Sequence, residues 1–173
     1  MTPEEFRKLY PHVIGWIQET LAAHSDEANT VSSFGFPRLS RYFSENLLSS
    51  TKVIIVDRVP MPPLSSMGLS QFAAFELGDF DGITYLDTFF VKRGSASAER
   101  LYFHELIHVV QWRLLGPERF LAVYANGLET MGYRESPLEA MAYNAEKSFC
   151  QSDQCFDAEN LVAKQLSRMP GTA

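Results

Sequence analysis

The hydrophobic positions at the start of the chain recur every three to four residues, which is the spacing of an α-helix. Thr2 and Glu5 form a capping-box start around Pro3, and the pattern continues to about Ala23. Pro11 is expected to kink or split this helix. One face of the helix carries the apolar residues Phe6, Leu9, Val13, Ile14, Ile17 and Leu21.

The middle of the chain alternates between apolar runs and segments rich in turn-forming residues. Residues 25–36 predict a loop, and residues 37–49 predict a second helix. The β-branched run at 52–59 predicts a strand. Residues 71–77 and 82–92 predict two more strands, which form a hairpin around the turn GDFDG.

Residues 101–116 would be apolar on nearly every side of a helix, which is typical of a buried helix. Ser95 or Ser97 is expected to cap this helix, with Glu99 in its first turn and Arg113 in its last. Further helices are predicted at residues 117–128, 136–149 and 157–169.

These elements together predict one α+β domain that spans residues 1–173. We expect a small, mainly antiparallel or mixed sheet packed against the central helix, with further helices on its C-terminal side. The length of 173 residues fits a single domain, and the 46% of hydrophobic residues are sufficient for a packed core.

The composition argues against a nucleic-acid or membrane partner. The net charge is −6, and Lys and Arg form no cluster. No run of about 18 apolar residues is present, and the N-terminus lacks the basic start of a signal peptide. We therefore expect a cytoplasmic location, whereas the oligomeric state stays open. We assign no function to Cys150 and Cys155, because a single C-x4-C without a second pair is a weak zinc signal. Without an export signal we expect free thiols, and a local disulfide is the alternative if the segment between them is a turn.

The central helix carries the motif H-E-x-x-H at residues 104–108. Residues four apart lie on one face of a helix, so His104 and His108 can direct their imidazoles at one point. That geometry suits a tetrahedral zinc ion, with nitrogen ligands at roughly 2.0–2.1 Å. Glu105 can reach a metal-bound water as a general base. The alternative is a pair of core histidines satisfied by hydrogen bonds, although buried ionisable groups are costly unless paired or metal-bound.

A catalytic zinc ion usually has three protein ligands and a water. The other two histidines, His12 and His24, lie far upstream, and neither has a ligand partner at helical spacing. A carboxylate downstream is therefore the better candidate for the third ligand. The segment 133–147 offers three of them, Glu135, Glu139 and Glu146.

The string HELIHVVQW, followed downstream by PLEAMAY, resembles the gluzincins, which are thermolysin-like zinc peptidases, and a group of bacterial zincin-like proteins. The resemblance covers roughly residues 82 to 147. It implies a zincin-like fold, zinc as the cofactor, and hydrolysis of peptide bonds in a peptide or protein substrate. It also implies that His104, His108 and Glu139 bind the metal. Glu105 would be the general base and later the general acid.

The assignment of Glu139 has one competing explanation. Glu139 is also the third residue of a helix that Ser136 begins, where a capping box would use the same carboxylate. Glu135 is the first substitute as the third ligand.

The sequence departs from the thermolysin pattern in two places. Four residues after the ligand Glu, those enzymes have an Asp that orients the first zinc histidine, and this chain has Tyr143. The partner of that histidine would then be Asn144, Glu146 or a backbone carbonyl. No histidine follows His108, so the oxyanion would need another donor. The candidates are Tyr124, Tyr133, Arg134 and Tyr143.

Two other functions compete with that of a peptidase. One is a non-catalytic zincin-like scaffold, in which the metal is structural or the domain binds a protein partner. The other is a carboxylate-bridged iron protein, because Glu105 and His108 also form an E-x-x-H motif. Such iron sites need two of these motifs, and this chain has one. For the peptidase, we expect strand 82–92 to lie beside the cleft, which loops 60–70 and 127–136 would shape.

Overall fold

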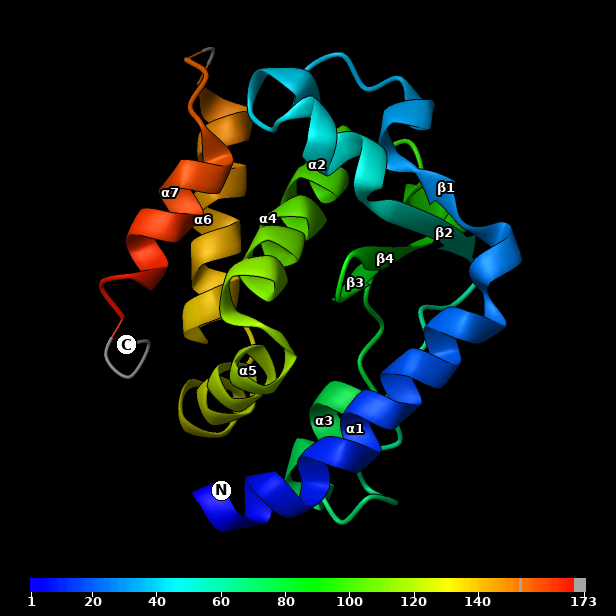
Figure 1. Ribbon diagram of the computed structural model, residues 1–173, viewed down its shortest axis with the longest axis vertical. Coiled ribbons are helices and arrows are strands. Elements are labelled where there is room, and N and C mark those ends of the chain that lie inside the picture. The colour runs from blue at the N-terminus through cyan, green and yellow to red at the C-terminus, as the bar shows by residue number, and fades with distance from the viewer. Residues whose placement is uncertain (153, 170–173) are drawn as a thin grey trace.

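The computed structural model describes residues 1–152 and 154–169, and these residues form an α+β fold. Helix α4 (Glu99–Leu115) lies at the centre, with a small sheet on one side and helices α6 (Pro137–Gln151) and α7 (Ala158–Leu166) on the other (Figure 1). Helix α5 (Pro117–Met131) follows α4 directly. The expected fold class, a small sheet packed against a central helix with further C-terminal helices, is confirmed.

The described strands form one mixed sheet in the order β1-β2-β4-β3. Strand β2 (Lys52–Val56) pairs in parallel with β4 (Thr88–Lys92). The outer strands β1 (Asn29–Thr30) and β3 (Gly82–Tyr85) pair antiparallel with their neighbours. Strand β3 is therefore an edge strand, and it contacts α4.

The predicted single strand at 82–92 is wrong, because this segment is itself the hairpin β3–β4. The chain turns at Leu86 and Asp87, and Leu86 has a positive φ of 59°. A leucine rarely adopts this conformation. The sequence therefore did not predict the turn, because the segment lacks the Gly or Asn that usually occupies such a position.

The predicted strand at 71–77 is also wrong. The segment forms a 3₁₀ turn at Ser70–Phe72 and the short helix α3 (Ala73–Glu76). Phe72 packs with Leu64 and Leu69 instead of entering the sheet. A short apolar run fits a strand and a buried helical turn equally well, so this error has a physical reason.

The second predicted helix, at 37–49, is divided in two. A 3₁₀ turn covers Leu39–Arg41, and helix α2 covers Glu45–Ser50. Ser44 starts α2, since its hydroxyl accepts a hydrogen bond from the backbone N–H of Leu47. The predicted loop 25–36 contains β1 and two 3₁₀ turns.

Helix α1 (Pro3–Ala23) has the predicted capping box between Thr2 and Glu5, and it continues through Pro11 without being split. The expected cap of α4 is wrong, because Ala98 occupies the N-cap position and makes no side-chain cap bond. The predicted end of α4 at Gly116 and the predicted start of α7 at Asp157 are confirmed.

The main core surrounds α4. Fully buried Phe103 stacks on Phe149 of α6, with ring centroids 4.4 Å apart, and also contacts Tyr42 and Phe43. A second, smaller hydrophobic cluster consists of the buried residues Leu64, Leu69 and Phe72. The partly buried residues that pack on this small cluster are Met1, Leu9, Val13, Phe75, Ala125 and Leu128.

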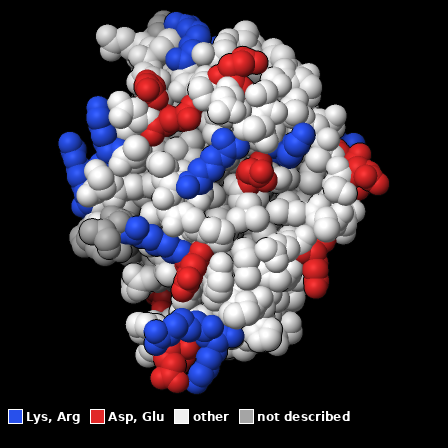
Figure 2. Space-filling view, viewed as in Figure 1, with Lys and Arg blue, Asp and Glu red and all other residues white. Residues whose placement is uncertain are grey.

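Basic and acidic side chains are intermixed on the face drawn in Figure 2, and much of that face is uncharged. Within residues 1–152 and 154–169, no helix combines the length and apolar character that crossing a membrane requires. Cys150 and Cys155 are exposed and are not joined in a disulfide.

Candidate metal centre

Helix α4 carries His104, Glu105 and His108 into the interior of the fold. Its apolar residues face the sheet on one side and α6 and α7 on the other, so these three polar side chains are also enclosed. Glu139, in the first turn of α6, lies next to them, and the four side chains are between 2% and 5% exposed. Four ionisable groups at this depth need mutual compensation or a bound ion.

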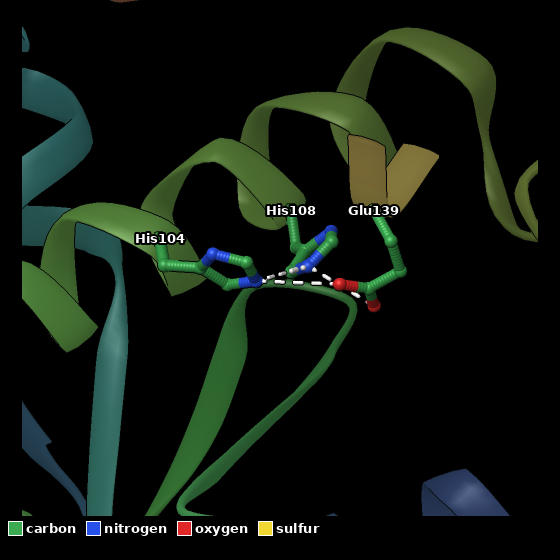
Figure 3. A group of neighbouring side chains, drawn as sticks. All are labelled: His104, His108 and Glu139. Carbon is green, nitrogen blue, oxygen red and sulfur yellow. Dashed lines mark hydrogen bonds and ion pairs between the residues drawn. The ribbon is translucent and has the colours of Figure 1, made fainter. Parts of the chain in front are cut away.

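The two histidines and Glu139 converge on one point (Figure 3). The Nε2 atoms of His104 and His108 are 3.1 Å apart. The two carboxylate oxygens of Glu139 lie 3.4 Å from these nitrogens, one from each. All three ligand atoms fall within 4.8 Å of one another, which is the spacing that a single metal ion can bridge. The i, i+4 geometry expected from the motif is confirmed.

The donor set fits a divalent metal ion. Two imidazole nitrogens and one carboxylate oxygen are the ligands of many catalytic zinc sites, which leave a fourth position open. Oε2 of Glu139 is buried and has no hydrogen-bond partner among the described residues. Burial alone would lower the pKa of His104, but the carboxylates of Glu139 and Glu146 raise it to about 10. The raised pKa favours the protonated imidazolium, whose positive charge compensates the buried carboxylates, and a metal cation would provide the same compensation.

Glu139 faces the histidines and does not complete a capping box. Ser136 is the N-cap residue of α6, but its hydroxyl donates to the carbonyl of Tyr133 and makes no cap bond. Oε1 of Glu139 accepts a hydrogen bond of 2.7 Å from the hydroxyl of Tyr124. Glu135 is exposed and lies outside the converging group. The expectation of a capping box is therefore wrong, and the geometry favours Glu139 over Glu135.

Glu105 lies against the edge strand β3. Its Oε2 accepts a hydrogen bond of 2.6 Å from the hydroxyl of Thr84. Its Oε1 lies beside Gly82, where a Cβ atom would come within 2.5 Å of it. Burial raises the pKa of Glu105, which brings a carboxylate closer to the range useful for a general base. The sequence indicated Glu105 but gave no sign that Gly82 makes room for it.

We expect Gly82→Ala to destabilise the protein by about 1–3 kcal/mol, which is typical of overpacking in a filled interior. The new methyl group would displace the Glu105 carboxylate from Thr84 or move the strand. Urea denaturation measures the free energy of unfolding. Gly94→Ala is the matched control, because a Cβ at Gly94 meets no atom within 4 Å. Equal stability of the two variants would contradict the close packing of Glu105 on β3.

The second nitrogen of each histidine also has a partner. Nδ1 of His104 lies 3.0 Å from Oε2 of Glu146, which selects Glu146 among the alternatives left open by the sequence. Nδ1 of His108 lies 2.8 Å from Oε1 of Gln111, whose amide donates to the carbonyl of Leu138. The sequence interpretation missed Gln111, although its position three residues after His108 places it on the same helix face.

The four candidate donors for an oxyanion occupy different places. Tyr124 is committed to Glu139. Tyr143 packs against His104, with ring centroids 4.6 Å apart, and the guanidinium of Arg134 lies over Tyr143. Tyr133 lines the cavity that adjoins Glu139. Of the four, Tyr124 and Tyr133 border the same cavity as the candidate ligands.

That cavity has a volume of about 110 Å³ and is mostly apolar. Glu105, His108 and Glu139 form one wall, and β3 forms another. The opposite walls come from α1 and from segment 62–75, together with α5. Segments 60–70 and 127–136, which were expected to shape a cleft, contribute Pro62, Leu64, Leu69, Leu128 and Tyr133. Their expected proximity to the site is confirmed, although 127–131 belongs to α5.

The outer edge of β3 faces α4 and is partly occupied. Trp112 donates from its indole to the carbonyl of Thr84 at 3.2 Å. The remaining histidines do not join the site, and His24 lies 2.9 Å from the carbonyl of Thr20 through its Nδ1. No second group of His and carboxylate residues occurs in the described parts of the chain, so a two-iron site gains no support.

Comparison of the chain with models of known families, with curated proteins and with solved structures yields no match. The functional argument therefore rests on the geometry of His104, Glu105, His108 and Glu139.

Proposed function

We propose that this protein is a zinc-dependent peptidase with a zincin-like arrangement. His104, His108 and Glu139 bind Zn²⁺, and Glu105 is the general base. The observation that carries this proposal is the convergence of the three ligand atoms within 4.8 Å, with Glu105 beside His108 and Glu139 on the wall of one cavity. An edge strand, a motif helix and a helix with the third ligand follow one another in the order that the resemblance implies.

A bound zinc ion lowers the pKa of a water molecule toward 7 and polarises a carbonyl oxygen. Glu105 takes the proton from the attacking water and passes it to the leaving amine. Thr84 holds one oxygen of Glu105 by its hydrogen bond, which leaves the other oxygen for proton transfer. The apolar walls of the cavity exclude bulk water and favour an uncharged, apolar side chain next to the scissile bond.

The substrate backbone can pair only with a short part of β3. Backbone groups in an antiparallel pair point alternately toward and away from the partner strand. The N–H of Lys92 donates to the carbonyl of Asp81, so Asp81 points its backbone groups toward β4. By the alternation, the backbone N–H and C=O groups of Gly82 and Thr84 point away from β4. Trp112 already occupies the carbonyl of Thr84. A peptide would therefore bind through Gly82 and the N–H of Thr84.

The test is hydrolysis of a diverse peptide mixture by zinc-loaded protein, with new termini identified by mass spectrometry. We expect cleavage beside apolar residues, loss of cleavage after chelation, and recovery when zinc is restored. A mixture that a known peptidase digests but this zinc-loaded protein leaves intact would contradict the proposed activity.

The burial of the site favours one second candidate, a zincin-like scaffold that binds metal without hydrolysing peptides. The exposure of the four polar side chains, 2% to 5%, is low for groups that must meet a substrate. Stoichiometric zinc in a protein that cleaves no peptide in the mixture would identify this second function.

A further inference from the structure

A chain of contacts connects His104 with the surface of the protein. Arg100, one helical turn before His104 on α4, lies with its Nη1 2.8 Å from Oε1 of Glu146. The other oxygen of Glu146 lies 3.0 Å from Nδ1 of His104. Each oxygen of Glu146 thus has its own partner. The Arg100 side chain is 62% exposed and that of Glu146 is 13% exposed, so the chain runs from solvent to the buried histidine.

A separate contact packs against the same imidazole ring. Tyr143 contacts His104 with ring centroids 4.6 Å apart. The guanidinium of Arg134 lies over the ring of Tyr143, with its Cζ 4.8 Å from the ring centroid. Tyr143 therefore restricts the tilt of the His104 ring. The hydrogen-bond partner of the His104 Nδ1 atom is Glu146 and not Tyr143. Tyr143, four positions after Glu139, packs on His104. Glu146, seven positions after Glu139, is hydrogen-bonded to His104.

Helix α6 supplies both the candidate third ligand and the partner of His104. Glu139 and Glu146 are seven residues apart, which places them two turns apart on one face of the helix. An acceptor at Nδ1 favours the tautomer that carries a proton there, and this leaves the Nε2 lone pair free for a metal. Because Glu139 and Glu146 lie on the same helix, the distance between the candidate ligand and the partner of His104 is fixed.

We propose that Glu146, held by Arg100, is the positioning residue that directs Nε2 of His104 at the metal, while Tyr143 fixes the ring plane by packing. This inference rests on the proposed metal centre and extends it. Glu146 acts through His104 and contacts neither substrate nor metal.

The test measures zinc affinity by competition with a chromophoric chelator, and it also records the visible absorption of the Co²⁺-substituted protein. We expect Glu146→Ala to weaken zinc binding by about 10- to 100-fold and to alter the Co²⁺ spectrum. Glu146→Gln keeps an oxygen acceptor and should lie between Glu146→Ala and the wild type. The exposed Glu135→Ala is the control for the loss of one negative charge and should match the wild type.

The outcomes separate three cases. If Glu146→Ala binds zinc within about twofold of the wild type and keeps the Co²⁺ spectrum, the positioning role is overturned, even if the variant melts at a lower temperature. If Glu135→Ala weakens binding as much as Glu146→Ala, the effect is one of net charge and the role is equally overturned. If the wild type binds no zinc, the metal centre itself fails, and this inference fails with it.

Discussion

Glu105→Gln is expected to remove peptide hydrolysis while leaving zinc in place. The amide cannot accept the proton of the attacking water, and loss of general-base catalysis should lower kcat/KM by about 10³-fold or more. Glutamine has nearly the same shape, and its carbonyl oxygen can still accept the hydrogen bond from Thr84. Because Glu105 is not among the converging ligands, the metal content should not change.

The measurement pairs kcat/KM on the best peptide from the mixture with zinc content from plasma mass spectrometry. Glu118→Gln is the matched control, since it makes the same chemical change at an exposed position on α5. A Glu105→Gln preparation that is free of wild type and still turns over substrate would rule out Glu105 as the base.

Glu139→Ala is expected to lose the metal, whereas Glu135→Ala should keep it. Removing Glu139 leaves two histidine ligands, which hold zinc far more weakly than a three-ligand site. Wild type should contain about one zinc ion per chain after excess metal is removed, and Glu139→Ala should contain close to none. His104→Ala should behave like Glu139→Ala, because it also leaves two ligands.

Circular dichroism and thermal melting establish whether each of these variants is folded when its metal is counted. Loss of zinc in Glu135→Ala, with zinc retained in Glu139→Ala, would exchange the roles of the two carboxylates. A wild type without metal, even after zinc is added and the excess removed, would reduce the H-E-x-x-H motif to a structural part of the core.

The sequence predicted those parts of the site that depend on one helix. The spacing of His104 and His108 fixes their common face whatever the rest of the chain does, and the apolar surroundings predicted the burial of α4. The third ligand depends on how α6 packs against α4, and local sequence carries no such information. Glu139 and Glu146 were both candidates, and only the tertiary packing shows that they serve opposite nitrogens of His104.

The strands were less predictable than the helices for a related reason. The turn that joins β3 to β4 contains Leu86, which disfavours a positive φ, and Asp87 is its one residue of a turn-forming type. The close approach of Glu105 to Gly82 likewise becomes visible only when α4 and β3 are placed together. Helices α1 and α7, by contrast, carry their own capping signals in Thr2 and Asp157.

The small hydrophobic cluster has a consequence for access to the site. Part of the cavity wall comes from α1 and segment 62–75. Leu9 of α1 and Phe75 pack on the small cluster of Leu64, Leu69 and Phe72, whereas Ile17, nearer the end of α1, belongs to the main core around α4. For the proposed peptidase, we expect a substrate to reach the enclosed carboxylates when the part of this wall around the small cluster separates from α5. The free energy of that local opening would be set by the contacts of three buried residues and the partly buried residues packed on them, so this part of the wall can open while α4 stays intact. The frequency of opening, and not the chemistry at Glu105, would then limit the rate of turnover.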